Sequence, residues 1–314
     1  MPETTAVAAA PESLAGSGVR RFPPSLARAP KPVRAAARYA ALLPFAGYVV
    51  YFLAVPLVVI IIGAFRSPAN GAFTMSNVDS AVHGVYLQGF RQSITVSLIA
   101  AVIPGVFGLL IAYAIFTAKR ASFLRQIVIT ASGVFANFGG VPLAFVFIAS
   151  VGSSALVTGW LHDIGLNIYS MGFSLSNVTG MELVYMYFQI PLMVLIILPA
   201  LEGLRPAWRE AAENLGAGSW QFWRYVGGPV LMPSFLSCLT LLFGSAFAAY
   251  ATAEALTSGS IALTSIQIGN LVSGNVLANG TNLGEALALG MVIIIAILMV
   301  CYLLLQRRAS KWLR

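Results

Sequence analysis

The chain has 314 residues, of which 59% are apolar and only 9% are charged. A soluble domain carries roughly 25% charged residues, so this composition excludes a water-soluble enzyme of this length. The net charge is +8, but the basic residues lie in short patches between long uncharged stretches rather than on one polar face. This distribution argues against a nucleic-acid-binding protein and is typical of a polytopic membrane protein.

The first 38 residues are rich in Pro, Ala and Arg and show no apolar periodicity. We therefore predict a disordered, basic, cytoplasmic tail over 1–38. The first apolar run follows at 39–65. It is too long, and begins too far into the chain, for a cleaved signal peptide. We expect this run to remain as a first transmembrane helix.

Six stretches of the sequence are long and apolar enough to cross a bilayer. A hydrocarbon core of roughly 30 Å needs about 20 apolar residues in a helix, which satisfies its own backbone polar groups. The predicted spans cover 39–65, 92–118, 126–150, 183–201, 225–253 and 286–306. The sequence therefore predicts an all-α polytopic membrane protein with six transmembrane helices.

The basic residues define the orientation of these spans, because cytoplasmic loops are enriched in Lys and Arg. With both termini in the cytoplasm, 16 of the 18 basic residues lie inside. They are Arg20, Arg21, Arg28, Lys31, Arg34, Arg38, Lys119, Arg120, Arg125, Arg205, Arg209, Arg224, Arg307, Arg308, Lys311 and Arg314. Only Arg66 and Arg91 lie outside. We therefore predict a multi-pass membrane protein with a basic C-terminal tail over 307–314.

Side chains that could carry catalysis are scarce. None of the three lysines follows a glycine, so the chain lacks a Walker A nucleotide-binding loop. His83 and His162 lie far apart, in outer loops, and form no zinc-binding HExxH pair. Cys238 and Cys301 lie in apolar runs and indicate neither a disulfide nor a metal site. We therefore expect a non-catalytic protein with no metal and no cofactor, which leaves transport or channel functions.

The third predicted span contains a candidate helix break. Asn137 and Phe138 precede Gly139 and Gly140, and a proline follows two residues later. Such a sequence can interrupt a helix and free backbone carbonyls, as in helices that line transport pathways. An ordinary packing kink is the favoured alternative. If the segment lines a pathway, Asn137 is its candidate polar residue.

Three acidic residues lie at the predicted outer ends of the last three spans: Glu182, Glu254 and Glu285. A ring of carboxylates at this level could attract a cationic solute or a binding protein. Alternatively, they are solvated helix ends, and Glu182 and Glu285 suit the positive N-termini of inward-running helices. The solvated alternative is favoured. Apolar residues in the loop 254–284 also predict a short helix at the outer interface.

The inside loop over 202–229 predicts two short helices joined by a bend. Pro206 suits the first turn of a helix. Gly216 is a natural left-handed stop, and Ser219 can cap the second helix. The second helix then leads back into the membrane.

The first of these helices has two different faces. Its apolar face is formed by residues at helical spacing: Trp208, Ala211, Ala212 and Leu215. On the other face, Arg209 and Glu213 can form an i, i+4 pair. An amphipathic hairpin resting on lipid headgroups is one interpretation. The alternative is a docking element for a cytosolic partner, with a small-residue face that fits a groove.

This loop resembles the EAA loop of permease subunits of binding-protein-dependent ABC importers. That pattern is Glu-Ala-Ala, three residues, Gly, nine residues, an aliphatic residue, one residue, Leu and Pro. The chain has Glu210-Ala211-Ala212, then Gly216 after three residues and Val226 after nine more, with Pro229 at the end. It departs from the pattern at Gly228, where Leu is usual, and this departure should loosen the exit of the second helix.

The resemblance covers about 92–306 and implies the five-helix core of a type I importer in the bacterial inner membrane, with 39–65 as an extra helix. It implies a coupling contact with a separate ATPase through six residues of the loop: Arg209, Glu210, Ala211, Ala212, Leu215 and Gly216. In this scheme Glu210 contacts the ATPase or braces the loop, the alanines permit close approach, and Gly216 makes the bend. The candidate pathway residues are Asn137, Gly139, Gly140, Glu182, Glu254 and Glu285.

Among these permeases the sequence looks most similar to the spermidine/putrescine branch and its relatives for iron(III), thiamine and phosphonates. The implied partners are a dimer of ATP-binding subunits, a second permease subunit, an extracytoplasmic solute-binding protein and the lipid bilayer, with no nucleic acid. A heterodimer with a different permease is favoured over a homodimer, and a polyamine-like cation is the favoured solute. The alternative function is an ion-coupled secondary transporter or channel, whose uptake would ignore ATP.

Overall fold

The computed structural model describes residues 42–118, 122–274 and 280–311, so the predicted tail over 1–38 lies outside the described residues. The chain divides into two compact units, Met1–Leu57 and Val58–Arg314. The helices are η1 (Val50–Ala54), α2 (Val55–Ala64), α3 (Ser76–Ala81), α4 (Gly84–Thr117), α5 (Ser122–Asn137), α6 (Gly140–Val151), α7 (Leu156–Asp163), α8 (Val178–Glu202), α9 (Pro206–Asn214), α10 (Ser219–Phe222), η2 (Trp223–Gly227), α11 (Gly228–Phe247), α12 (Ala251–Thr257), α13 (Thr264–Val272) and α14 (Thr281–Lys311).

The predicted all-α membrane fold is confirmed. Within the described ranges, six helical stretches have the length and composition to cross a membrane: Leu42–Ala64, Gly84–Thr117, Gly140–Asp163, Val178–Glu202, Ser219–Phe247 and Thr281–Leu304. In the same ranges the only β-type pairing is an isolated bridge between Arg66 and Phe73. The chain is a multi-pass integral membrane protein, because each of these apolar helices is long enough to cross the bilayer and satisfies its own backbone polar groups.

The predicted third span, 126–150, is not one kinked helix. It is split into α5 and α6, and the favoured packing kink is therefore wrong at this position. Gly139 is extended, with φ −143° and ψ −166°, and Gly140 has φ +72°. These two conformations end α5 and start α6 in a new direction, which a simple kink would not do.

The fifth span begins earlier and ends earlier than predicted. The chain is helical from Ser219 to Phe247, because α10, the π-turn η2 and α11 follow one another without a gap. The predicted end at 253 is wrong, because the helix stops at Phe247 and α12 starts separately at Ala251. The second helix of the inside loop is therefore the first part of a membrane span.

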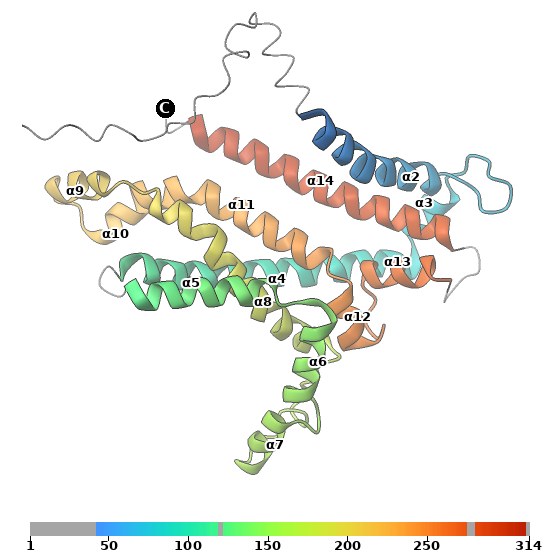
Figure 1. Ribbon diagram of the computed structural model, residues 1–314, viewed down its shortest axis with the longest axis horizontal. Coiled ribbons are helices and arrows are strands. Elements are labelled where there is room, and N and C mark those ends of the chain that lie inside the picture. The colour runs from blue at the N-terminus through green and yellow to red at the C-terminus, as the bar shows by residue number, and fades with distance from the viewer. Residues whose placement is uncertain (1–41, 119–121, 275–279, 312–314) are drawn as a thin grey trace, which may run out of the picture. The chain divides into compact units, whose positions relative to one another are not determined.

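Three long helices, α4, α8 and α11, form the centre of the Val58–Arg314 unit, and α5 packs along α8 (Figure 1). Glycines in α4 allow the close approach. A Cβ atom on Gly108 would lie 2.5 Å from Cβ of Met193 in α8, and one on Gly105 would lie 2.3 Å from Leu239 in α11. Small residues at such crossings let helix backbones pack tightly, which drives helix association in a membrane.

Buried polar contacts tie the short helices and the central helices together. The Ser93 hydroxyl of α4 accepts from the backbone N–H of Thr264 in α13 at 2.8 Å. The fully buried Gln189 of α8 donates to the carbonyl of Leu242 in α11 at 3.0 Å. The helix predicted within 254–284 is α13, and it packs against α4 and α14 rather than resting free at the surface.

Candidate coupling loop and pathway residues

The bend predicted in the inside loop is present. Pro206 is at the first turn of α9, and Nε of Arg209 donates to Oε1 of Glu213 at 2.9 Å. Gly216 follows α9 with φ +79°, the left-handed conformation predicted for it. The helix stops there because the left-handed residue turns the chain out of the helical path.

The predicted cap of the second helix is wrong in one residue. Gly218, and not Ser219, is the N-cap of α10. The side chain of Gln221 reaches back, and its Oε1 accepts from the N–H of Gly218 at 2.9 Å. This contact satisfies the N–H of Gly218, while Ser219 is already the first residue of the helix and cannot be its N-cap.

Large apolar side chains of the loop are exposed. No residue of α9 is buried. Leu215 is 88% exposed and Trp220 is 74% exposed. Glu210 and Ala211 are also exposed, and Ala212 is half-buried. Exposed apolar side chains of this kind suit contact with lipid headgroups or with a partner protein.

Aromatic packing holds one end of the loop, residues 219–227, against the membrane helices, and we call this end the root of the loop. Phe222 is buried, and its ring meets Trp223 edge-on with centroids 5.7 Å apart. Trp223 in turn meets Tyr113 of α4 edge-on at 5.2 Å. These contacts hold the second helix of the loop against α4, while α9 stays uncovered.

An ion pair that the sequence analysis did not predict joins two helix ends near the loop. Nη2 of Arg125, in the first turn of α5, donates to Oε1 of Glu202, the last residue of α8. The signal was present as opposite charges at the inner ends of the third and fourth predicted spans. Their pairing depends on α5 lying beside α8, which the pattern of apolar residues does not specify.

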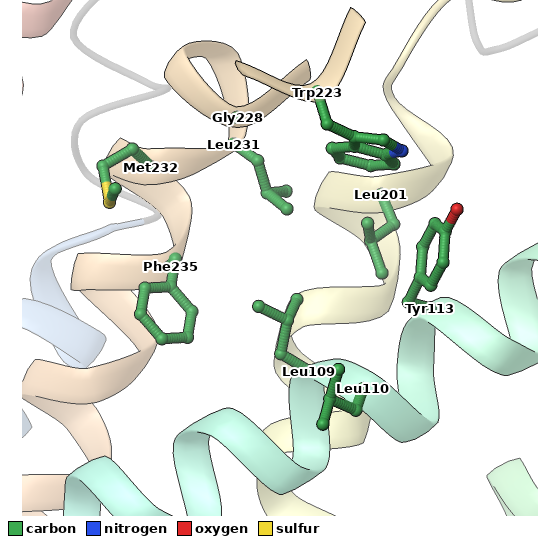
Figure 2. Close-up of a pocket in the computed structure, with 9 residues that line it drawn as sticks. All are labelled: Leu109, Leu110, Tyr113, Leu201, Trp223, Gly228, Leu231, Met232 and Phe235. Atoms are coloured by element: carbon green, nitrogen blue, oxygen red, sulfur yellow. The ribbon is translucent and has the colours of Figure 1, made fainter. Parts of the chain in front are cut away.

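An apolar cavity of about 390 Å³ lies beside the root of the loop, between α4, α8 and α11 (Figure 2). Gly228, the residue that departs from the EAA pattern, lies in its wall. A Cβ atom on Gly228 would lie 2.5 Å from the carbonyl oxygen of Trp223. The π-turn η2 therefore fits a glycine at this position and not the usual leucine.

The break between α5 and α6 is joined to α12. The backbone N–H of Gly140 donates to the hydroxyl of Thr252 at 3.0 Å. Asn137 caps its own helix, because its side-chain amide donates to the carbonyl of Gly133 at 2.8 Å. The structure thus brings Gly140 next to the helix that carries Glu254, whereas Asn137 makes a local contact.

These two adjacent glycines give a matched test of the break. Alanine at Gly140 is expected to destabilise the chain by roughly 1–2 kcal/mol, because a non-glycine residue is strained at φ +72°. Alanine at Gly139 is expected to be neutral, since its backbone is extended and no atom lies within 4 Å of the added methyl. Thermal unfolding of both variants in detergent measures the difference. Equal unfolding temperatures would contradict the assigned break.

The three predicted pathway carboxylates lie in different surroundings. Glu182 is only 6% exposed, and neither of its carboxylate oxygens has a hydrogen-bond partner. Glu285 packs against Gly63, and its Oε2 accepts from Asn282 at 3.4 Å. Glu254 has one buried oxygen without a partner. In the part of the chain that the structure describes, no hydrogen bond or ion pair joins two of the three.

The helix-end explanation for two of these residues is not supported by the helix bounds. α8 begins at Val178, capped by the Asn177 side chain, and α14 begins at Thr281. Glu182 and Glu285 therefore lie beyond the first turn, where the favourable effect of a helix N-terminus has largely faded. Glu182 is also buried, so it is not the solvated helix end that was favoured for it.

His, Cys, Asp and Glu side chains are the groups that could hold a metal ion or form a redox site. Across residues 42–118, 122–274 and 280–311, no three His, Cys, Asp or Glu side chains lie together as a metal site would need. Cys238 is buried and Cys301 is exposed, and both are free thiols.

Solved structures of two transporters share the fold of this chain. The chain is similar to a subunit of a bacterial ABC transporter that imports the acidic polysaccharide alginate, with a TM-score of 0.69 and 18% identity, over 88% of this chain and 96% of that one. It is also similar to the inward-facing MetNI methionine ABC transporter, with a TM-score of 0.53 and 14% identity, over 71% and 95% of the two chains. The chain has the fold of an ABC importer permease, as predicted.

Sequence relatives narrow the comparison. No protein-family model matches the chain. It is 27% identical over 218 residues to a probable sulfate transport system permease protein cysT of Marchantia polymorpha, which covers 67% of this chain and 69% of that protein. It is 26% identical over 212 residues to the sulfate permease CysW of Escherichia coli strain K12, over 67% and 68%. The thiamine permease ThiP of that strain is 32% identical over 107 residues, 34% of this chain and 20% of ThiP.

These relatives support the predicted resemblance to ABC importer permeases and a location in the plasma membrane. They do not support the predicted spermidine/putrescine branch, because the similar proteins carry sulfate and thiamine names.

Proposed function

We propose that the chain is the membrane-spanning permease subunit of an ABC importer, driven by a separate ATPase that docks on the loop over 202–229. The observation that carries the proposal is the exposed helix α9, bent at Gly216, with Glu210, Ala211 and Ala212 at EAA spacing. The ion-coupled alternative gives no reason for this spacing. The relatives and the fold favour the importer.

The proposed coupling runs through one helical rod. Closure of the ATPase pair displaces α9, and Gly216 and Gly218 transmit the pull to α10. The helix from Ser219 to Phe247 has 29 residues and spans roughly 44 Å, enough to carry the motion across the bilayer. The ion pair between Arg125 and Glu202 gives a second connection, from the end of α8 to α5.

Residues of α9 have separate proposed roles. Glu210 contacts the ATPase or braces the loop, while Ala211 and Ala212 permit close approach of the partner. Leu215 is the apolar anchor, and Arg209 is held by its pair with Glu213. ATP hydrolysis then belongs to the partner, and this chain supplies no catalytic group.

The proposed assembly contains two permease subunits, two ATPase subunits and an extracytoplasmic binding protein. The alginate transporter was solved in complex with a periplasmic protein bound to an alginate pentasaccharide. By analogy, a loaded binding protein would dock on the outer loops here. A heterodimeric permease remains our proposal for this chain. The proposed pathway includes Gly139 and Gly140 at the helix break, Asn137, and the buried Glu182, with Glu254 and Glu285 at the outer side.

The proposed solute is a small oxyanion such as sulfate, in place of the polyamine-like cation favoured by the sequence. Sulfate permeases are among the similar proteins. Arg91 lies near the outer end of α4 and is exposed, and within the described residues its guanidinium has no ion-pair or hydrogen-bond partner. A free outer cation favours an anion and disfavours a polyamine.

Uptake of radiolabelled sulfate into cells that carry the complete transporter tests the solute. Excess sulfate should compete with the label, and excess spermidine or thiamine should not. Arg91→Gln is expected to raise the KM for sulfate about tenfold, the value of one lost charge-assisted contact. Arg66→Gln is the control, because Nε of Arg66 already donates to the Gly71 carbonyl at 3.3 Å. If spermidine competes and sulfate does not, the solute is a cation and the oxyanion proposal is wrong.

A further inference from the structure

The apolar cavity beside the root of the loop has the dimensions of a ligand site. Its volume of about 390 Å³ lies in the range of roughly 300–1,000 Å³ that is usual for small-molecule sites. Its walls come from three different membrane helices, and all the lining residues are apolar or aromatic apart from Gly228. The coupling proposal leaves this cavity unused, because α9 lies outside it.

The cavity stays open because of the backbone geometry where η2 joins α11. At Gly228 the π-turn η2 meets α11, and no side chain fills the space. A leucine at this position would need its Cβ within 2.5 Å of the Trp223 carbonyl oxygen. The side chains of Leu231, which is buried, and Leu109 point toward each other across the cavity (Figure 2). A site of this kind accepts an unbranched hydrocarbon rather than a polar solute.

The depth of the cavity indicates what surrounds it. Leu201 is the residue before the last of α8, and Tyr113 lies four residues before Thr117, the last residue of α4. At 1.5 Å per residue, these lining residues are within roughly 6 Å of the inner ends of their helices. This is the level of the boundary between acyl chains and headgroups, where Trp and Tyr are enriched.

Two lining residues carry hydrogen-bond donors, and a basic residue follows one of them in the chain. Figure 2 shows the indole nitrogen of Trp223 and the hydroxyl of Tyr113 on the same side of the cavity. Arg224 follows Trp223 directly, is exposed, and stacks its guanidinium over Tyr225 at 5.8 Å. Within the described residues no carboxylate pairs with Arg224. An arginine beside two donors suits a phosphate group.

We propose that this cavity binds an acyl chain of an anionic phospholipid from the inner leaflet. The acyl chain lies between Leu109 and Leu231 and uses the space left by Gly228. The phosphate lies at the mouth, next to Arg224, Tyr113 and Trp223. A lipid at this position packs against the junction between the coupling loop and α11.

Native mass spectrometry of the purified full-length chain tests the proposal, after extraction from membranes that contain phosphatidylglycerol. The wild-type chain should retain one phosphatidylglycerol. Met232→Trp should lower this retention about tenfold, equivalent to about 1.4 kcal/mol, because Met232 lines the cavity and an indole fills it. Leu241→Trp is the matched control on the same helix and should retain the lipid. Both native residues are similarly exposed, 53% and 51%, so neither change disturbs the core.

A second variant tests the headgroup. Arg224→Gln should reduce the preference for phosphatidylglycerol over phosphatidylcholine about tenfold while leaving the total bound lipid measurable. Equal lipid retention in Met232→Trp and Leu241→Trp would overturn the proposal. Finding only detergent bound to the wild-type chain would also overturn it. So would finding that a second copy of the protein, rather than a lipid, is bound and is lost in Met232→Trp but not in Leu241→Trp. The measurement needs neither ATPase nor solute, so its failure is distinct from failure of the transport proposal.

Discussion

Leu215→Asp is expected to separate the chain from its ATPase and to abolish ATP-dependent uptake. Leu215 is 88% exposed next to the bend at Gly216, so the change costs the chain itself little stability. In the complex it would bury an unpaired carboxylate at the centre of the contact. Loss of such an anchor is worth 2 kcal/mol or more, roughly 30-fold in affinity. Co-purification of the ATPase with the tagged chain measures the association, and solute uptake measures the function.

Leu156→Asp is the control for this substitution. Leu156 is 72% exposed and lies in α7, at the end of the candidate span Gly140–Asp163 that the predicted orientation directs toward the outside. The ATPase should co-purify with the Leu156→Asp chain as with the wild type. If Leu215→Asp keeps both the ATPase and normal uptake, the loop is not the coupling contact.

Gly108→Val is expected to destabilise the central helix pair more than any surface change. The valine Cβ would lie 2.5 Å from Cβ of Met193 and 2.9 Å from the carbonyl oxygen of Ile190. Met193 is fully buried and cannot withdraw into solvent. Overpacking of a tight core costs about 1–3 kcal/mol, so thermal unfolding in detergent should occur roughly 5 °C lower.

Gly133→Val separates this effect from the general cost of replacing a helical glycine. Gly133 lies in α5, and no atom is within 4 Å of a Cβ at that position. This variant should unfold at or slightly above the wild-type temperature, because valine is the better helix former of the two residues. Equal destabilisation by both substitutions would show that α4 and α8 are not closely packed at Gly108.

Much of the fold could be predicted because the membrane imposes it. Apolar runs bounded by charged residues can only be helices in lipid, and the spans around Gly84–Thr117 and Val178–Glu202 follow from this rule. The bend of the loop was also predictable, because proline favours the first turn of a helix and glycine favours a left-handed helix end, as at Pro206 and Gly216. The pair between Arg209 and Glu213 needed only local helix geometry.

The remaining features depend on contacts between distant parts of the chain. The sequence near Gly140 permits a kink or a break, and the bond from Gly140 to Thr252 of α12 is long-range information. The pair of Arg125 with Glu202 needs the packing of α5 on α8. The cavity at Gly228 arises from a π-turn, which has no simple residue signature.

We propose that the loop over 206–226 is the contact through which a separate ATPase moves this chain, and site-specific photo-crosslinking can identify what this loop contacts. A photoreactive amino acid at Leu215 should crosslink to the ATPase in membranes of cells that carry the whole transporter. The same probe at Leu156 should give no ATPase adduct. An ATPase crosslink from position 156, or none from position 215, would show that the ATPase does not dock on this loop as proposed.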